Sequence, residues 1–499
     1  MSPPSPRLRT GKQRMNKHYY TTIGLEIHAE LKTETKMFCN SKNDPDEERP
    51  NVNVCPVCMA HPGTLPVINK KAVEHVIRVG LALGGKIADF TEFDRKNYFY
   101  PDIPKGYQIS QYKYPIVSGG SLNGVAITRV HLEEDTANSK HDRGDFSLVD
   151  FNRAGVPLME LVTEPVINSP EQAGAFAREL QLLLRTLGVS EANMEKGQMR
   201  VEANISVSTD PKVFGTKIEV KNLNSFRSAE RAIKYEVERM TELLDSGKGN
   251  EIVQETRGWD ENKQSTFSQR TKESSHDYRY FPDPDLPKLK LLEAFSAKGG
   301  PALGWEELRK SLPELPWIKR ERLMSLGITA EAAEIFLTNL MLGDYFEAVT
   351  APFKSDKDLS AQAGKIKLAS NYITSDIVAH MKAKQDFTLP SAGSFTELIN
   401  MISLGKISSR GAKELLAYMH GDESPEKIAN EKGLIQKSDE GELKAMIEKI
   451  LGENETVVAE YKQGKESALQ YLVGQAMKVS KGAGNPVVIK KILLELLSK

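Results

Sequence analysis

The chain has 499 residues, only three cysteines and no apolar run long enough to span a membrane. Three thiols in so long a chain do not make a disulfide framework, so we expect a reducing, cytoplasmic compartment. No hydrophobic segment near the N-terminus resembles a signal peptide. The formal net charge is −1, which excludes a globally basic protein. Any surface that binds nucleic acid must therefore be local.

The length predicts two or three domains, each with its own core. Residues 1–18 contain five basic residues, three prolines and no acidic residue, which predicts a disordered N-terminal extension. Residues 19–294 show short alternating runs with a few helical stretches, the pattern of an antiparallel α+β domain. From residue 295 onward, apolar residues recur with helical spacing. The chain is therefore predicted to be α+β first and all-helical afterwards.

Ionisable residues are concentrated between Ile127 and Pro165. Alternation in LMELVTE places Leu158, Glu160 and Val162 on one face of a strand. A carboxylate in such a run must face water or be held by a cation, because burying it alone is too costly. The stretch predicts an acidic metal-binding cleft or, equally well, a solvated sheet face with ordinary ion pairs. The residues concerned are His131, Glu133, Glu134, Asp135, Asp150, Glu160 and Glu164.

A second group of candidates lies in the first predicted strand, TTIGLEIHAEL. Alternation places Glu26 and His28 on one face, about 7 Å apart. A histidine on a strand is most often only a hydrogen-bonded side chain. A neighbouring glutamate on the same face favours a site more than a lone histidine would.

Cys39, Cys55, Cys58 and His61 are candidate ligands of a structural zinc ion. The Cys-x-x-Cys pair suits one half of a tetrahedral site, with Cys39 as a third ligand and His61 as the fourth. Ser41 stands where the second cysteine of a Cys-x-Cys pair would be. The alternative is three buried thiols without a metal.

Residues 93–112, FDRKNYFYPDIPKGYQISQY, are dense in aromatic and charged side chains. They predict a site where cations hold phosphates and aromatic rings stack a base or a terminal adenosine. A tyrosine-rich loop packed over the sheet is the alternative. The residues expected to bind phosphate or to stack a base are Arg95, Tyr98, Tyr100 and Tyr107, together with Arg279 from a second cluster near residues 270–280.

The C-terminal tail is locally basic, with seven lysines and two glutamates between Lys462 and Lys499. Lys478 and Lys481 lie near a predicted helix end, before a glycine-rich turn. This arrangement suits the backbone phosphates of an RNA. Lysines that merely face solvent are the alternative.

Seven long motifs, in order along the chain, resemble the B subunit of the bacterial glutamyl/aspartyl-tRNA amidotransferase. The resemblance extends from about Tyr20 to the C-terminus. The motifs are IGLEIHAELKTETKMF, FDRKNYFYPDIPKGYQISQY, HLEEDTANS, DFNRAGVPLMELVTEP, KNLNSF, HDYRYFPDPDLP and YLVGQAMKVSKGAGNP.

The resemblance implies a ligase that forms a carbon–nitrogen bond with glutamine as the amide donor (EC 6.3.5.-). Such an enzyme uses ATP and Mg²⁺ to phosphorylate the side-chain carboxylate of Glu-tRNA(Gln) or Asp-tRNA(Asn), which gives a γ-glutamyl or β-aspartyl phosphate. Ammonia released by an amidase subunit, A, displaces the phosphate to yield Gln-tRNA(Gln) or Asn-tRNA(Asn). A small subunit, C, completes a heterotrimer.

The resemblance also implies an architecture and site residues. The expected domains are a cradle-shaped catalytic domain at 19–294, a helical domain at 295–410 and a tRNA-binding tail domain at 411–499. Some family members hold zinc with four cysteines, and others lack them. The positions that match the family's magnesium ligands are His28, Glu134 and Glu160, and those that match other kinase-site motifs are Glu26, Lys96 and Glu133.

One position conflicts with simple alternation. Counting from Ile127 places Glu134 on the same side as Val130 and Leu132, so the strand is expected to end or bulge near Leu132.

Two other functions stay open from the residues alone. One is a free-standing hydrolase that uses paired carboxylates, and the other is a non-catalytic RNA-binding scaffold.

Overall fold

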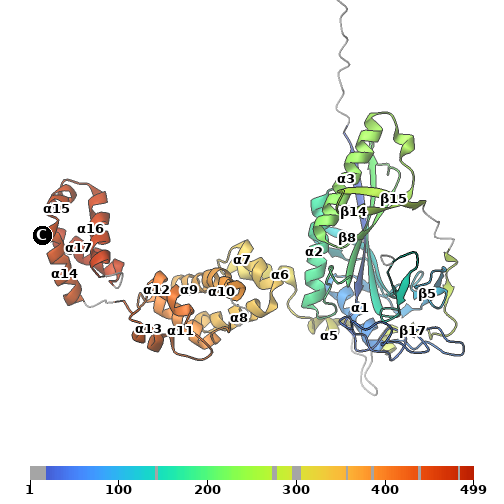
Figure 1. The fold of residues 1–499 in the computed structure, drawn as a ribbon, viewed down its shortest axis with the longest axis horizontal. Coiled ribbons are helices and arrows are strands. Elements are labelled where there is room, and N and C mark those ends of the chain that lie inside the picture. The colour runs from blue at the N-terminus through green and yellow to red at the C-terminus, as the bar shows by residue number, and fades with distance from the viewer. Residues whose placement is uncertain are drawn as a thin grey trace, which may run out of the picture. The chain divides into compact units, whose positions relative to one another are not determined.

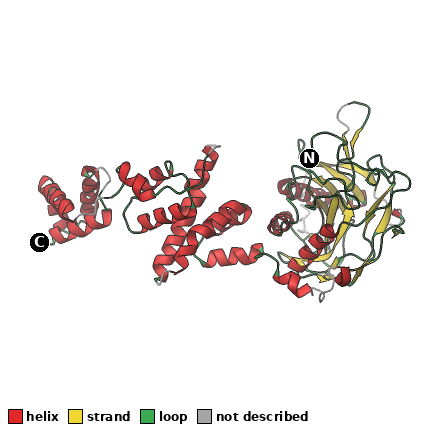
Figure 2. Ribbon diagram, turned by 90° about the horizontal axis from the view of Figure 1, so that it is seen from below, coloured by secondary structure: helices red, strands yellow, loops and turns green. Residues whose placement is uncertain are grey.

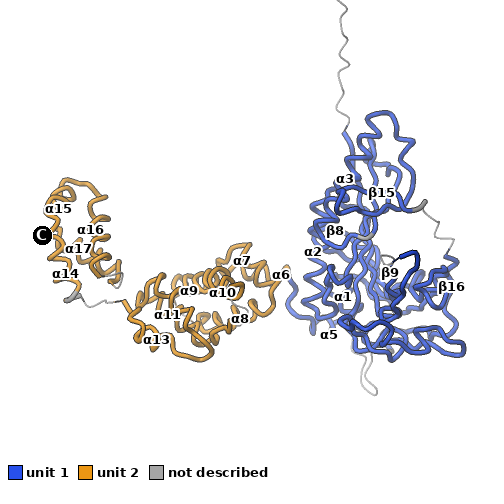
Figure 3. The backbone as a smooth tube through the Cα atoms, in the orientation of Figure 1, with its two compact units in different colours: residues 1–316 blue, residues 317–499 orange. Residues whose placement is uncertain are grey.

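The computed structural model describes most of the chain, and it divides into two compact units, residues 1–316 and 317–499 (Figure 3). The predicted extension up to residue 17 and Lys481 lie outside the described residues. Among the described residues, no helix has the length and apolar character needed to cross a membrane. The described ranges are 18–140, 144–271, 278–294, 305–355, 358–383, 387–436, 440–480 and 484–498.

A ten-stranded sheet forms the centre of the first unit (Figures 1 and 2). Its pairings are antiparallel except for the parallel pair β13–β14, so the predicted antiparallel α+β fold is confirmed. In spatial order the strands are β15 (Ser265–Thr271), β14 (Glu255–Asp260), β13 (Ile218–Leu223), β12 (Met199–Ser208), β1 (Tyr20–Glu30), β11 (Pro157–Thr163), β8 (Val125–Glu134), β6 (Val117–Ser118) and β2 (Lys86–Ile87), with β7 (Ser121–Leu122) paired to β8.

The two faces of this sheet differ because side chains alternate along each strand. Ile23, Leu25 and Ile27 on β1 are essentially inaccessible to solvent, whereas Glu26 and His28 point to the other face. Three helices contact the sheet (Figure 1), and asparagine or serine side chains cap their first turns. These helices are α1 (Lys70–Ala82), α2 (Pro170–Thr186) and α3 (Phe226–Asp245).

Smaller sheets bring distant segments together. β4 (Asp94–Asn97) pairs with β5 (Tyr107–Ser110) and with β16 (Phe281–Pro282). This pairing joins the two aromatic stretches that the sequence separates by almost 200 positions. The other paired strands are β3 (Phe90–Thr91) with β17 (Leu289–Lys290) and β9 (Asn138–Lys140) with β10 (Leu148–Asp150), and the short helices are η1 (Gly249–Glu251), α4 (Leu291–Ala294) and α5 (Trp305–Lys310).

The second unit is helical in its described secondary structure (Figure 2), as predicted. Its helices are α6 (Pro316–Ser325), α7 (Ala330–Thr338), α8 (Leu340–Thr350), η3 (Ala351–Ser355), α9 (Leu359–Tyr372), the π-helix η4 (Ile373–Ile377), α10 (Val378–Ala383), α11 (Ala392–Ser403), α12 (Ser409–Leu416), α13 (Pro425–Glu431), α14 (Glu440–Glu453), α15 (Glu455–Lys462), α16 (Glu466–Val479) and α17 (Pro486–Leu497).

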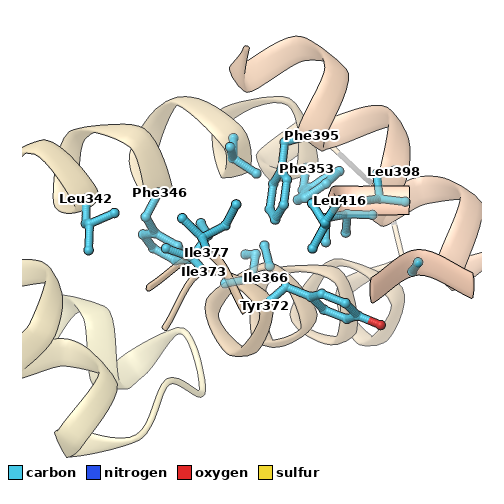
Figure 4. Close-up of a cluster of buried hydrophobic side chains, with 14 of the residues drawn as sticks. Leu342, Phe346, Phe353, Ile366, Tyr372, Ile373, Ile377, Phe395, Leu398 and Leu416 are labelled. Carbon is cyan, nitrogen blue, oxygen red and sulfur yellow. The ribbon is translucent and has the colours of Figure 1, made fainter. Parts of the chain in front are cut away.

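Two hydrophobic clusters stabilise this unit. The first extends along the chain from Leu323 to Ala429 and includes the stacked rings of Phe336 and Phe346, whose centroids are 4.3 Å apart (Figure 4 labels Phe346). The second extends from Leu443 to Leu497. The predicted domain borders, 294/295 and 410/411, stay predictions.

Candidate active site on the polar face of the sheet

Three ionisable side chains form a row across neighbouring strands. His28 on β1 is directly opposite Glu160 on β11, and Glu160 is directly opposite His131 on β8. Directly opposite residues share a face and have close Cβ atoms. The Nε2 atoms of both histidines lie 3.4 Å from Glu160 Oε2. The sheet register therefore places one carboxylate between two imidazoles.

Two further carboxylates extend this row. His28 Nε2 lies 3.5 Å from Glu133 Oε1 and 3.8 Å from Glu26 Oε1. Two overlapping sets of ligand atoms are each contained within 4.8 Å, and Glu160 is common to both. We call Glu26, His28, His131, Glu133 and Glu160 the carboxylate–histidine cluster. Of the two alternatives from the sequence, the solvated sheet face does not apply here, because His131, Glu133 and Glu160 are buried.

The charges of the cluster change its proton affinities. Burial lowers the pKa of His28, but the hydrogen bond and charge of Glu160 and the charge of Glu133 outweigh burial and raise the pKa to about 9. Burial and the charges of Glu160 and Glu202 raise the pKa of Glu26 to about 7. Burial also opposes the ionised form of Glu160, yet His131 and His28 hold its pKa well below the ordinary value. These directions show that the acids of the cluster stabilise positive charge at its centre.

Glu134 lies elsewhere. It is opposite Pro157, one position beyond the pair of Glu133 and Leu158, so its side chain points to the opposite face of the sheet. There it accepts hydrogen bonds from Lys105 Nζ at 2.6 Å and from the Ile109 amide at 2.9 Å. The structure brings His28 and Glu160 together, but it does not bring Glu134 to them.

The predicted irregularity near Leu132 is wrong in position. β8 continues to Glu134, and the register shifts where Arg129 and Ile127 pair with Val162 and Thr163. Thr128 is the extra residue of this bulge, so the parity of the strand is unchanged between His131 and Glu134. Glu133 therefore stays on the polar face, two positions after His131.

Lys96 lies near the cluster among tyrosine rings. Its Nζ is 5.1 Å from the centre of the Tyr278 ring and 5.7 Å from that of Tyr98. Burial opposes the charged form, but Glu133 and the tyrosines hold the pKa of Lys96 well above its ordinary value. The Tyr280 ring stacks on that of Tyr112 at 4.5 Å. The structure therefore brings the two predicted aromatic stretches together, and the Lys96 ammonium lies between rings from both.

The other predicted phosphate- or tRNA-binding residues have varied surroundings. Arg95 forms ion pairs of 2.8 Å with Asp283 and with Asp285, and its guanidinium lies 4.3 Å from the Tyr107 ring centre. Tyr100 is half exposed. Arg279 is exposed and has a positive φ of 45°. The charge of Arg95 is thus balanced within the protein, whereas Tyr100 and Arg279 are accessible.

Cys39, Cys55 and Cys58 lie together and offer sulfur atoms within 4.8 Å of one another. Cys39 donates a hydrogen bond that lowers the pKa of Cys58 to about 4, and Lys36 Nζ lies 3.8 Å from Cys58 Sγ. The sequence analysis missed this lysine. Ser41 Oγ is 3.7 Å from the same sulfur. His61 is exposed and lines the neighbouring cavity of about 240 Å³, but it is not part of the thiol group.

Sequence reasoning missed two other cations near the cluster. Arg129, two residues before His131 on β8, has a side-chain nitrogen 3.6 Å from Glu160 Oε1. Arg200, opposite His28, makes a paired contact of 3.0 and 3.1 Å with Asp135. The alternation of residues along β8 and β12 could have placed both side chains on the polar face.

In the second unit, Lys478 is exposed in the last turn of α16.

Comparisons with known proteins identify the family of the chain. The family model described as "GatB/GatE catalytic domain" matches residues 21–297, and the model described as "GatB domain" matches residues 356–497. Three similar proteins each bear the name of the B subunit of an aspartyl/glutamyl-tRNA(Asn/Gln) amidotransferase.

The protein from Thermoanaerobacter pseudethanolicus is 43% identical, over 96% of this chain and 100% of its own length. The protein from Carboxydothermus hydrogenoformans is 40% identical, over 97% and 100%. The protein from Persephonella marina is 42% identical, over 95% and 98%. At this identity and coverage, the chain belongs to the family of B subunits of aspartyl/glutamyl-tRNA(Asn/Gln) amidotransferases.

Proposed function

We propose that this chain is the B subunit of a cytoplasmic, glutamine-dependent amidotransferase that converts Glu-tRNA(Gln) or Asp-tRNA(Asn) to the amidated product. In this proposal it uses ATP to phosphorylate the side-chain carboxylate of the misacylated tRNA. An amidase subunit, A, supplies ammonia, and a small subunit, C, completes the heterotrimer. The observation that supports the phosphorylation step is the convergence of three acids, two histidines and one lysine on one sheet face.

We assign the magnesium ligands to His28, Glu133 and Glu160. The alternation of β8 favours Glu133 over Glu134, because only Glu133 shares a face with the other two. Magnesium prefers carboxylate oxygens and is usually bound through one or two carboxylates, which suits the two acids of this set. When bound, Mg²⁺ would neutralise charge on the phosphate oxygens.

The chain's own residues would position the reactants. Phosphoryl transfer needs little covalent chemistry from a protein; it needs cations and alignment. Lys96 is a positive charge between the acids and the tyrosines, suited to hold a phosphate oxygen or the carboxylate of the substrate. With its pKa near 7, Glu26 can hold or release a proton at its carboxyl. The half-exposed Tyr100 and the exposed Arg279 are suited to stack or pair with the end of the tRNA.

The C-terminal tail, residues 411–499, is proposed to bind the body of the tRNA. Lys478 is exposed at the end of α16, where a lysine can reach a backbone phosphate. Lys481 is included in this proposal from the sequence alone.

We propose a structural zinc ion at the three thiols, bound with a weak fourth ligand. Zinc prefers four ligands in tetrahedral geometry. The thiols provide three of them. The hydrogen bond from Cys39 lowers the pKa of Cys58 to about 4, which favours the thiolate that a metal needs, and it raises the pKa of Cys39, which would lose its proton on binding the metal. His61 does not join them, so Ser41 or water would complete the site.

The test uses the purified heterotrimer with Glu-tRNA(Gln), labelled ATP and Mg²⁺. Release of phosphate that depends on misacylated tRNA is expected, and Glu160→Gln should abolish it. Glu191→Gln, which removes one partner of an exposed ion pair with Lys32, is the matched control. A folded complex that hydrolyses its substrate without ATP would support a hydrolase, and unchanged activity in Glu160→Gln would support a scaffold.

A further inference from the structure

One guanidinium at the edge of the carboxylate–histidine cluster has no task in the proposed function. Arg129 on β8 is directly opposite Val162 on β11, and Val162 is directly opposite Glu26 on β1. Directly opposite residues share a face, so Arg129 is on the polar face, about 7 Å along the strands from the row of His28 and Glu160. Its side chain is 35% exposed, so a solute can reach it.

The bulge in β8 directs Arg129 to this face. Ile127, two positions earlier, is buried and lies directly opposite Thr163. A regular strand would place Arg129 on the same face as Ile127, because side chains alternate with a period of two. The extra residue Thr128 reverses this parity. Bulges beside active sites re-aim side chains in this way, so the backbone itself favours a functional role for Arg129.

The guanidinium of Arg129 has donors to spare. Within the described part of the chain, its ion pair is with Glu160, whose Oε1 lies 3.6 Å from an Arg129 nitrogen. This distance is too long for a hydrogen bond. Arg129 Nε is buried and has no hydrogen-bond partner among the described residues. Because a buried polar group without a partner is rare and costly, an anion that accepts its hydrogen bonds would offset that cost.

Two other arginines near the cluster are held at hydrogen-bond distance. Arg200 contacts Asp135 at 3.0 and 3.1 Å, and Arg95 contacts Asp283 at 2.8 Å. Such charge-assisted contacts use the donors of the guanidinium on a carboxylate of the protein. Arg129, in contrast, presents its planar fork of donors to the polar face, where a ligand can occupy it.

Two cations are at opposite ends of the cluster. Arg129 and Glu133 are four residues apart on β8, about 13 Å in a strand. Lys96 interacts with Glu133 and lies among tyrosine rings. Phosphoryl transfer requires cations and alignment of both reactants. Lys96, beside rings that can stack a base, suits the acylated end of the tRNA, and Arg129 is then left for the phosphate donor.

We propose that Arg129 is a catalytic residue whose guanidinium holds the γ-phosphoryl group of ATP while this group moves to the side-chain carboxylate of the misacylated tRNA. The proposal rests on the proposed function, since it concerns the same transfer. The bond from the γ-phosphorus to the oxygen that bridges it to the β-phosphorus breaks, and ADP leaves with its electron pair. A bond from the same phosphorus to a carboxylate oxygen forms. Two phosphoryl oxygens match the bidentate geometry of a guanidinium.

The experiment compares Arg129→Ala and Arg129→Lys in the heterotrimer. In Arg129→Ala, kcat for ATP cleavage that depends on misacylated tRNA should fall about a thousandfold, the effect of removing an arginine from a phosphoryl-transfer site. KM for ATP should change less than about threefold, because the contact strengthens in the transition state. Arg129→Lys should recover little of this activity, since an ammonium lacks the planar fork.

Binding distinguishes a contact with the reacting group from a structural role. Equilibrium dialysis measures the Kd of labelled ADP with and without aluminium fluoride, which mimics the transferring phosphoryl group. Arg129→Ala should weaken binding of the analogue at least about a hundredfold and leave the Kd of ADP alone unchanged. Arg231→Ala is the matched control, because Arg231 Nη1 is also 3.6 Å from a glutamate oxygen, that of Glu261. It should change neither kcat nor either Kd.

Three results would overturn this inference: an unchanged kcat in a folded Arg129→Ala complex, an equal loss of ADP and analogue binding, or wild-type activity in Arg129→Lys. The last would show that only a positive charge beside Glu160 is needed. Thermal melts check folding, and Arg129→Lys keeps that charge and tests the inference if Arg129→Ala does not fold. A wild-type heterotrimer that does not cleave ATP with misacylated tRNA would refute the proposed function instead.

Discussion

His28 on β1 and Glu160 on β11 are directly opposite, with His28 Nε2 3.4 Å from Glu160 Oε2. The antiparallel register makes this contact, because each residue is the partner of the other across the ladder. Glu133 joins the pair from β8, with its Oε1 at 3.5 Å from the same nitrogen. Glu134, the next residue in the sequence, faces away. This difference between neighbours leads to the first prediction.

Glu133→Gln and Glu134→Gln should have different effects. Glu133→Gln removes a charge from the proposed metal ligands and should raise the Mg²⁺ concentration needed for half-maximal ATP cleavage at least about tenfold. Glu134→Gln should leave that concentration unchanged and lower stability by about 1–3 kcal/mol, because Lys105 loses its partner. A magnesium titration of ATP cleavage and a urea unfolding curve of each variant heterotrimer measure these two effects. A large magnesium effect in Glu134→Gln alone would restore Glu134 as a ligand.

The stability of the first unit should depend on pH through Glu30. Burial and the charge of Asp135 raise the pKa of Glu30 to about 8, while Arg153 and Arg200 oppose the shift only in part. A raised pKa means that the folded state binds the proton more tightly than the unfolded state. The contribution of Glu30 to stability is therefore fully present below about pH 4.5 and is lost as the pH rises through 8.

Glu30→Gln removes this titration. Relative to the variant, the wild type should lose on the order of 1–3 kcal/mol between pH 5 and pH 9. Urea unfolding midpoints at both values, followed by tryptophan fluorescence, measure the difference. If the unfolding midpoints of the wild type and the variant differ by the same amount at pH 5 and at pH 9, Glu30 is not the titrating group.

Ser41→Cys should convert a weak zinc site into a strong one. Ser41 Oγ is 3.7 Å from Cys58 Sγ, so a thiol at position 41 is suitably placed to be the fourth ligand. Metal analysis after purification should give well under one zinc per wild-type chain and close to one per Ser41→Cys chain. Ser311→Cys, at an exposed site in the same unit, is the control for non-specific binding. Equal zinc contents in wild type and Ser41→Cys would argue against the proposed geometry.

The first hydrophobic cluster of the second unit should depend on Phe346. This side chain is fully buried and stacks on Phe336 (Figure 4 labels Phe346). Phe346→Ala should lower the free energy of unfolding by about 3–5 kcal/mol, because it removes contacts and leaves a cavity. Leu340→Ala, at an exposed position in the same helix, should change it by less than about 0.5 kcal/mol. Urea unfolding followed by circular dichroism measures the free energy of unfolding of both variants. Similar decreases in the two variants would contradict the proposed dependence of the cluster on Phe346.

Local sequence patterns were enough to predict the class of fold and the polar face of the sheet. Alternation along β1 is a local property, so it already separated Glu26 and His28 from their apolar neighbours, whereas in β11 it placed Glu160 on one face with Leu158 and Val162. The same counting placed Glu134 beside Val130 and Leu132, and the structure agrees. The long motifs shared with the amidotransferase family pointed to the stretch that contains Glu133 and Glu134. Because these two glutamates are adjacent in one motif, the motif did not reveal which of them faces the site.

The contacts across the strands, in contrast, could be known only from the three-dimensional fold. The bulge lies at Thr128 instead of Leu132, β4 pairs with β16, and Gly24 lies opposite Asn204. Each depends on which distant segments pair and in what register, and a shift of one residue would move a side chain to the other face. No local pattern carries that information, because it arises from the packing of the whole sheet.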